Sequence, residues 1–489
     1  MDKIYVNGMR FVDEHGRERI FSGMNVCDKR DFDKENPFYG HSPDKFPFEE
    51  FRARGYDMIR LGFTWSCMEP TPGNYNEDLI SSICTFLDKC AEHNIYAYLD
   101  CHQDVYSSYC YGDGAPRWAT ITDEFVPRKP IAVWAEPYFY GKACFRAFDN
   151  FWANVEYNKK GLQDYFADMW KHLVEATKDK PALFGFDFLN EPFPGEDGGK
   201  IFRNVIKGLV KTTLTDKRVK ISELVKEGVF GKEKPKALDQ YPGDVLSKIT
   251  SGGNDIVRKF DTERYSPFVS KMASAVREIT DNGMMFIENN YYSNMGIPCC
   301  NTPVMVNGER EPKQVFAPHA YDLMVDTPAY KYASNSRVGM IFDEHRKTQE
   351  RLNVPCLVGE WGSCAEGDGW YPHIQFLQDK FDSYKWSNTY WCYFDDILKQ
   401  DFMRILTRPR PKAVTGEILS YKYDHKDNEF EIKYIQDKDY DVPTVIYAHK
   451  EPKEIKCNGE YKVIELPGNI GYDIEFKTDI GENEIEIEF

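Results

Sequence analysis

Two glutamates stand at the ends of apolar runs and could do chemistry. Glu191 follows the run 185–190 (GFDFLN), and Glu360 follows the run 356–359 (CLVG). A continuous apolar run is typical of a strand buried on both faces in a parallel sheet. The C-terminal ends of such strands in a barrel are where catalytic side chains lie. Hydrolysis of a glycosidic bond needs two such carboxyls, because one protonates the leaving oxygen and the other attacks the sugar or activates water.

Strands must position these glutamates, and eight strand-like runs occur before residue 408. They are predicted at residues 21–26, 58–63, 95–102, 183–190, 284–289, 315–320, 356–361 and 389–394. Amphipathic segments between them predict helices at residues 79–93, 165–177, 268–280 and 341–353. Strands that alternate with helices favour parallel βαβ units, and eight units predict a closed (β/α)8 TIM barrel.

The rest of the chain adds long connections and a second domain. The connections 105–154 and 195–264 follow strand ends, so we expect these two long loops to overhang the mouth of the barrel. Residues 4–22 predict an N-terminal hairpin, which we assign to the barrel domain 1–407. Residues 408–489 alternate apolar and polar positions between turn signals, which predicts a C-terminal antiparallel β-sandwich.

Composition limits the partners of this chain of 489 residues. Its net charge of −17 opposes a polyanionic partner, so we expect no nucleic acid. No apolar run approaches the length of a membrane span. We see no secretory signal, and several of the 13 cysteines lie inside strand-like runs, so we expect a cytoplasmic protein unless a leader was removed before Met1. No metal-binding spacing occurs, and we expect neither a metal nor a cofactor.

Further polar or aromatic residues follow the strands in barrel order. They are Arg60 after the second strand, His102 after the third, Asn190 after the fourth, His319 and Tyr321 after the sixth, and Trp391 after the eighth. This pattern resembles the family-five glycoside hydrolases of clan A. Segments 23–29, 100–104, 112–119, 147–154 and 289–292 are similar to the endoglycosylceramidase branch, whereas residues 199–236 depart from it.

The chemistry of a retaining reaction assigns roles to five of these residues. Glu191 would be the general acid and later the base, which requires that its proton be held near neutral pH. Glu360 would be the nucleophile, kept ionised by Arg60 and accepting a hydrogen bond from Tyr321. Asn190 would bind the 2-hydroxyl of the sugar, whose hydrogen bonds strengthen in the transition state.

The remaining candidates would bind sugar. His102 and His319 would position hydroxyls or tune the general acid, and Trp391 would form the platform under the first sugar. Asp100 shares the strand face of His102. The resemblance implies that Asp100 and Lys29 bind the outer hydroxyls of that sugar; the alternative is an ordinary salt bridge at the rim.

Other carboxylates and one basic segment complete the candidates. Asp104 and Asp322 lie just beyond strand ends and would support the site from outside, and Glu288 is expected to be a structural hydrogen-bonding partner. Residues 200–236 carry 11 Lys or Arg against 4 Asp or Glu, with apolar residues at helical spacing. Such a helix predicts peripheral contact with an anionic membrane surface, or a solvated lid that packs on the barrel.

Three functions are consistent with these residues. We expect a retaining β-glycosidase that cleaves the bond between a glycan or glucose and a lipid aglycone such as ceramide. An exo-acting β-glucosidase, either a glucosylceramidase or an enzyme for steroid or plant glucosides, uses the same chemistry. A non-catalytic glycolipid-binding protein is the alternative from another class.

Overall fold

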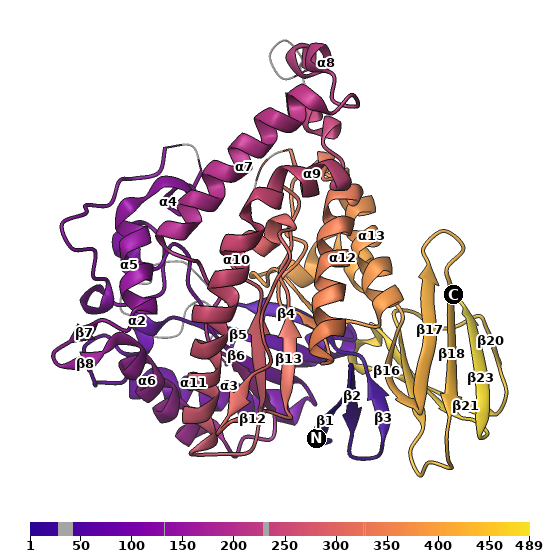
Figure 1. Ribbon diagram of the computed structural model, residues 1–489. Helices are drawn as coiled ribbons and strands as arrows, with labels where there is room; N and C mark the ends of the chain where they lie inside the picture. Colours follow the sequence, from indigo (N-terminus) through magenta and orange to yellow (C-terminus); the bar gives the residue numbers. More distant parts are fainter. Residues whose placement is uncertain (28–42, 132, 228–233, 326, 328) are drawn as a thin grey trace.

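A barrel and a β-domain lie side by side in the computed structural model (Figure 1). The structure describes residues 1–27, 43–131, 133–227, 234–325, 327 and 329–489. The N-terminus lies beneath the barrel, and the C-terminus lies in the β-domain (Figure 1).

Eight parallel strands close the barrel. They are β4 (Ser22–Val26), β5 (Met58–Phe63), β6 (Tyr96–Cys101), β9 (Leu183–Asp187), β10 (Met284–Glu288), β13 (Gln314–Ala317), β14 (Leu357–Val358) and β15 (Ser387–Tyr390). Hydrogen bonding follows the order β13-β10-β9-β6-β5-β4-β15-β14. Parallel bridges from Phe316 to Cys356 and from His319 to Glu360 join β14 back to β13. The predicted TIM barrel is therefore confirmed.

Among the described residues, eight α-helices outside the two long connections follow strands of the barrel. They are α1 (Phe48–Ala53), α2 (Trp65–Met68), α3 (Glu77–Glu92), α6 (Leu162–Thr177), α11 (Ser266–Arg277), α12 (Asn335–Leu352), α13 (Tyr371–Tyr384) and α14 (Met403–Leu406). Four of them, α3, α6, α11 and α12, lie where the amphipathic pattern predicts them. In α3, for example, Leu79, Ile83 and Phe86 recur at helical spacing and are all buried. The connection from β10 to β13 is different, because it holds the turn η7 (Tyr291–Met295) and the hairpin of β11 (Met305–Val306) and β12 (Glu309–Arg310) instead of a helix.

The eighth strand was predicted at the wrong position. We expected residues 389–394, whereas β15 begins at Ser387 and ends at Tyr390. The aromatic run that continues beyond Tyr390 suggested a longer strand. Trp391 instead leaves the ladder at the barrel mouth, where it forms a single bridge with Gly362 and lines a cavity.

Both long connections contain helices, and the second is largely helical, which corrects their description as loops. The first contains η1 (Ser108–Cys110), η2 (Arg117–Ala119), α4 (Glu136–Tyr140) and α5 (Lys142–Trp152), followed by the small hairpin of β7 (Glu156–Tyr157) and β8 (Lys160–Gly161). The second contains α7 (Glu196–Thr215), α8 (Ile221–Val225), η4 (Lys234–Gln240), α9 (Gly243–Thr250), η5 (Ser251–Gly253), α10 (Asn254–Phe260) and η6 (Asp261–Tyr265). Phe139 of α4 stacks on Phe202 of α7 at 4.7 Å, so the two connections pack on each other.

The predicted C-terminal β-sandwich is confirmed. One sheet contains β16 (Arg410–Thr415), β19 (Thr444–Ala448), β22 (Tyr472–Lys477) and β21 (Glu460–Glu465), and the other contains β17 (Glu417–Asp424), β18 (Glu429–Gln436), β23 (Gly481–Glu488) and β20 (Glu454–Cys457). Alternate residues of these strands, such as Ile432, Ile446, Ile474 and Ile485, meet in one buried cluster.

The N-terminal strands belong to both domains, which corrects their assignment to the barrel alone. β1 (Ile4–Asn7), β2 (Arg10–Asp13) and β3 (Arg17–Arg19) extend the first sheet of the sandwich, since β3 pairs with β16. The same strands close the floor of the barrel, where Phe11 packs on Phe21 and Phe184. Without β3, the edge of β16 would be left unpaired, and this is the physical reason for the arrangement.

Candidate active site

Arg60 on β5 is the centre of a buried charge network beneath the barrel mouth. Its side chain is fully buried, and its guanidinium contacts groups from five other strands or strand ends. The carboxylates in contact with its guanidinium, at 2.7 to 3.1 Å, are those of Asp100, Asp187, Glu288 and Glu360. The guanidinium also donates to the amide oxygens of Asn25 and Asn190. A planar guanidinium with five N–H donors suits this role, which a lysine could not fill.

Glu360 follows β14 and lies at the edge of this network. Its Oε1 accepts from Arg60 at 2.7 Å, and its Oε2 accepts from the Tyr321 hydroxyl at 2.9 Å. Both donors stabilise the ionised carboxylate, and neither can remove a proton from it. The predicted partners of Glu360 are therefore in contact with it.

Glu191 lies four residues beyond the end of β9 in a backbone conformation that side chains rarely adopt. Its φ is +44°, and its N–H donates to Glu288 Oε2 at 2.6 Å. Its Oε1 accepts from the Asn294 amide at 2.7 Å. A non-glycine residue persists in this region only where its surroundings hold it there, so these contacts fix the direction of the carboxyl group.

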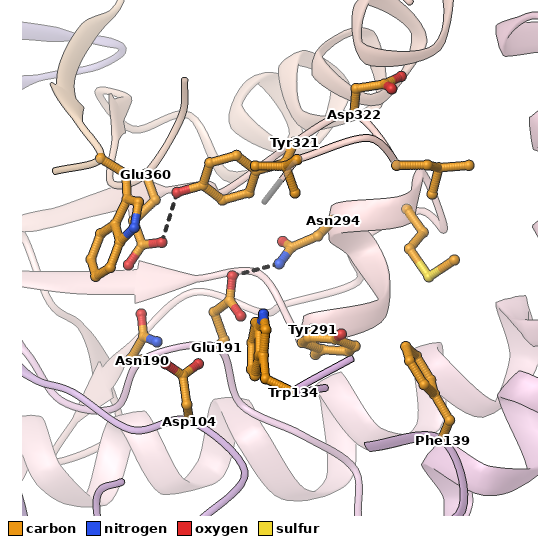
Figure 2. A pocket seen from close by; sticks show the side chains of 14 residues that line it. Asp104, Trp134, Phe139, Asn190, Glu191, Tyr291, Asn294, Tyr321, Asp322 and Glu360 are labelled. Carbon is orange, nitrogen blue, oxygen red and sulfur yellow. Dashed lines mark hydrogen bonds between the residues drawn. The ribbon is translucent and has the colours of Figure 1, made fainter. Parts of the chain in front are cut away.

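The two glutamates face each other across a short gap. Glu191, His319 and Glu360 each place one oxygen or nitrogen within 4.8 Å of the others. Figure 2 shows the two carboxylates with their hydrogen bonds to Asn294 and Tyr321. Retaining glycosidases hold their carboxyls about 5 Å apart, whereas inverting ones need about 6.5 to 9.5 Å to admit a water. The separation fits the retaining geometry.

His319 is a neutral spacer between these acids. Burial lowers the pKa of its imidazole to about 3, even though Glu360 acts in the opposite direction. Its Nδ1 lies 3.3 Å from Glu191 Oε1 and 3.8 Å from Glu360 Oε2. A neutral imidazole can donate one hydrogen bond without forming an ion pair that would hold both carboxylates ionised.

The predicted sugar-binding residues lie in two layers. Trp391 lines the cavity, and His102 stacks beneath it with 5.3 Å between ring centroids and 15° between planes. Asp100 is fully buried, with Oδ1 on Arg60 at 2.9 Å and Oδ2 on His102 Nδ1 at 2.8 Å. Lys29 lies outside the described residues, so the binding of outer hydroxyls by Asp100 and Lys29 stays a prediction.

The cavity has a volume of about 210 Å³ and differs in chemistry from end to end. Its polar lining residues are Asp104, Asn190, Glu191, Asn294, Tyr321, Asp322 and Glu360. Its apolar or aromatic lining residues are Trp134, Phe139, Tyr291, Met295, Leu323, Val325 and Trp391. In Figure 2, Glu360 and Asn190 lie on one side, and Tyr291 and Phe139 lie on the opposite side.

Asn294 was missed in the sequence, because it lies on the turn η7, where no strand or helix pattern marks it. Trp134 and Phe139 belong to the connection 105–154, whose many aromatic residues are the sequence signal for binding an apolar aglycone. Asp322 lines the cavity but also accepts two hydrogen bonds from Arg337 at 2.8 and 3.0 Å, so it anchors α12.

Clusters of side chains that could ligate a metal occur near the site. In one of these clusters the guanidinium of Arg60 already lies among the carboxylates. Asp100, Asp187 and Glu288 bring one oxygen each within 4.8 Å of one another. Arg60 contacts all three, so its guanidinium takes the place that a metal would need. The prediction that the reaction uses no metal or cofactor remains a prediction.

Two protein-family models match this chain. The model of the cellulase family, glycosyl hydrolase family 5, matches residues 12–219 and 250–396, and that of the family 5 C-terminal domain matches residues 408–476. The chain belongs to glycosyl hydrolase family 5. The family predicted from the sequence is confirmed.

The relatives of this family 5 chain include endoglycoceramidases, glucosylceramidases and an ergosteryl-beta-glucosidase of Saccharomyces cerevisiae, to which the chain is 30% identical over 196 residues. The chain is 33% identical over 215 residues to an endoglycoceramidase of Cyanea nozakii, and 27% identical over 246 residues to a glucosylceramidase of Rhizopus delemar. These matches cover 38% and 39% of this chain, and only 41% and 36% of the relatives. The resemblance to the endoglycosylceramidase branch is thereby confirmed.

A solved structure shares the fold over the whole chain. It is that of endo-glycoceramidase II from Rhodococcus sp. in complex with ganglioside GM3, with a TM-score of 0.72, 19% identity and 99% coverage of both chains. At this identity the similarity supports the fold alone.

Tyr321→Phe tests whether the contact with Glu360 matters for the reaction. A hydrogen bond to a charged group is worth about 1.5 to 3 kcal/mol, so we expect kcat/KM on a dinitrophenyl β-glycoside to fall about 10- to 100-fold. Tyr106→Phe is the matched control, because its buried hydroxyl donates to the Ala119 carbonyl and not to a carboxylate. Equal kcat/KM values for the two variants would show that the Tyr321 hydroxyl does not support Glu360.

Proposed function

We propose that this family 5 protein is a retaining β-glycosidase that cleaves the bond between a glycan or glucose and a lipid aglycone. One observation carries the proposal: Glu191 and Glu360 face each other within 4.8 Å, in a cavity whose far end is apolar. A purely binding protein gains nothing from two carboxylates at this separation, so catalysis is favoured over the non-catalytic alternative.

The geometry supports a double displacement. Glu360 attacks the anomeric carbon while Glu191 protonates the oxygen that leaves with the aglycone, which gives a glycosyl ester on Glu360. Glu191, now ionised, then takes a proton from water as that water attacks the anomeric carbon. The ester bond breaks, Glu360 is ionised again, and Glu191 regains its proton.

Arg60 and Asn190 would prepare this site for the sugar. The amide oxygen of Asn190 accepts a hydrogen bond from Arg60, and one amide N–H of Asn190 donates to the Gln103 carbonyl. Its second amide N–H is left for the 2-hydroxyl of the bound sugar. Because both existing contacts are buried, the amide is held before substrate arrives, and binding needs no reorganisation of it.

The two ends of the cavity would bind the two parts of the substrate, the sugar and the aglycone. The sugar would lie between Asn190, Glu360 and the ring of Trp391, and the aglycone would leave past Glu191 toward Phe139 and Tyr291. An alkyl chain buried there gains about 25 cal/mol for each Å² removed from water. The names of the relatives, endoglycoceramidase and glucosylceramidase, support a sugar linked to a lipid.

Glu191→Ala separates the roles of the two glutamates. A phenol of low pKa departs without a proton, so we expect the first step to survive far better on a nitrophenyl glycoside than on an alkyl-linked glycolipid. Added azide should restore turnover, because it replaces water at the unassisted second step. Equal losses on both substrates, without an azide effect, would contradict the acid/base assignment.

A panel of glycolipids tests the substrate and decides between endo and exo action. We expect the protein to release sugar from ceramide-linked substrates that carry one or several sugars. Release of an intact oligosaccharide would identify endo action, and release of glucose alone would identify exo action. If no glycolipid is cleaved while short aryl glycosides are, the lipid assignment is wrong and the alternative of a steroid- or plant-glucoside hydrolase takes its place.

The helix α7 supports the second part of the proposal, peripheral contact with a lipid surface through residues 200–236. Its apolar residues divide between two faces. Ile201 and Val205 are buried on the side where α7 packs on helices of the two long connections, whereas Ile206, Val210 and Leu214 are 43%, 54% and 69% exposed. The lid alternative explains the first face and leaves the second unexplained.

Basic residues lie beside the exposed apolar residues of α7. Arg203, Lys207 and Lys211 repeat every four residues beside the apolar row, and no ion pair to Lys207 or Lys211 occurs within the described residues. α7 rises from the end of the barrel at which the strands terminate (Figure 1). Through the stack of Phe202 on Phe139, α7 also adjoins the apolar end of the cavity.

The membrane contact proposed here is one of docking. No helix within the described ranges has both the length and the apolar character needed to cross a bilayer. Three aliphatic side chains that enter an interface gain roughly 1.5 to 3 kcal/mol each, and anionic lipids would attract the basic row. A cytoplasmic location is part of the same proposal and awaits a localisation experiment.

Replacing Ile206, Val210 and Leu214 together with Ser tests this surface. We expect KM for glycolipid in anionic vesicles to rise, while kcat/KM on short nitrophenyl glycosides is unchanged, because these side chains are exposed and distant from the carboxylates. The matched control replaces Tyr461, Val463 and Ile480 of the β-domain, which are also exposed, with Ser. If both triple variants bind vesicles like the wild type, α7 is a lid only; added salt should weaken wild-type binding.

A further inference from the structure

Two buried carboxyls, Asp187 and Glu288, lie beneath the two glutamates of the cleft. They end the neighbouring strands β9 and β10, which pair in parallel. Each places one carboxyl oxygen within 4.8 Å of an oxygen of the other. Neither was among the residues that the sequence pattern assigned to the reaction.

These two carboxyls cannot both carry a charge. Burial raises the pKa of Asp187 to about 6, and burial together with the charge of Asp187 raises the pKa of Glu288 well above its usual range. In the described part of the chain, Arg60 is the one Lys or Arg that forms an ion pair with either of them. One cation that already serves Asp100 and Glu360 cannot neutralise two more carboxylates.

If only one of the two carboxyls is ionised, the other carries a proton, and the hydrogen bonds of the pair indicate which one. Asp187 Oδ2 accepts from Arg60 at 3.1 Å, while its Oδ1 is buried and has no donor among the described N–H and hydroxyl groups. A proton on Glu288 supplies that donor. The pair then shares one proton and carries one negative charge.

We propose that Glu288 is a positioning residue of the glycosidase reaction, holding the general acid and the nucleophile in register while sharing a proton with Asp187. Its Oε2 accepts the N–H of Glu191 at 2.6 Å, and its Oε1 contacts Arg60 at 2.7 Å. Arg60 in turn holds Glu360. One side chain therefore connects the backbone of the acid, at its unusual φ, to the cation that orients the nucleophile.

The shared proton matters because of the charge on Glu360. A second full charge at Glu288 would compete with Glu360 for Arg60 and would repel it. A neutral Glu288 keeps both contacts and leaves more of the field of Arg60 for the nucleophile. The inference rests on the proposed retaining function of Glu191 and Glu360.

Two variants and a spectrum test the proposal. Glu288→Gln is neutral but has a single acceptor oxygen, which can accept from the N–H of Glu191 or from Arg60 but not from both, so we expect its loss in kcat/KM to be smaller than that of Glu288→Met. Glu288→Met fills a similar volume without an acceptor for either contact, and a misplaced general acid should cost about 100-fold. We expect the loss to be larger on an alkyl-linked glycolipid than on a dinitrophenyl glycoside, since only the former needs the proton of Glu191. The infrared spectrum of wild type near neutral pH should contain a protonated-carboxyl band that Glu288→Gln lacks.

The matched control is Asp382→Asn, which removes another buried carboxylate, paired with Arg408 at 2.6 Å and remote from the cleft. It should lower the stability and leave the ratio of activities on the two substrates unchanged.

Wild-type cleavage of a nitrophenyl glycoside tests the proposed function separately. A difference spectrum, wild type minus Glu288→Gln, without the protonated-carboxyl band would overturn proton sharing. Unchanged activity of Glu288→Met would overturn positioning, and if Glu288→Met does not fold, Glu288→Gln and the spectrum still decide.

Discussion

The arrangement of the barrel mouth depends on one guanidinium. Arg60 contacts carboxylates that belong to β6, β9, β10 and the end of β14, and amides that belong to β4 and the end of β9. To leave one buried charge of such a network unpaired costs about 3 to 5 kcal/mol, so a strand that shifted would lose more than its ladder hydrogen bonds. The register of the strands and the geometry of the catalytic carboxylates are thus coupled through a single side chain.

Local sequence signals predicted the residues that interrupt a pattern. Arg60 lies inside an apolar strand, and Glu191 and Glu360 follow apolar runs, so each stands out from its neighbours. Asp187 lies in the same apolar run as Glu191, but one change of polarity there did not reveal which charge it contacts. Its partners come from other strands, and only the closed barrel brings them together.

The errors in predicting the fold have a common cause, which is that distant partners override local patterns. The pattern of β1 to β3 predicted a hairpin correctly, but it could not reveal that β3 pairs with residues near Val414. The connection after β10 contains only the short 3-10 helix η7 and no α-helix, although every other strand up to β14 is followed by at least one α-helix. That connection supplies Asn294, the hydrogen-bond donor to Glu191, from a turn whose position is set by tertiary packing.

The neutrality of His319 follows from the same accumulation of acids. Opposite charges nearby usually raise the pKa of a histidine, and Glu360 does act in that direction, yet burial dominates and the imidazole stays uncharged. If His319 were protonated, it would form ion pairs with Glu191 and Glu360 at once and would favour an ionised general acid. Arg60 then remains the permanent cation beside Glu360, and Glu191 lies next to a neutral ring and the Asn294 amide. The two glutamates thus differ in charged surroundings although they are less than 5 Å apart, which is the condition that acid and nucleophile must meet together.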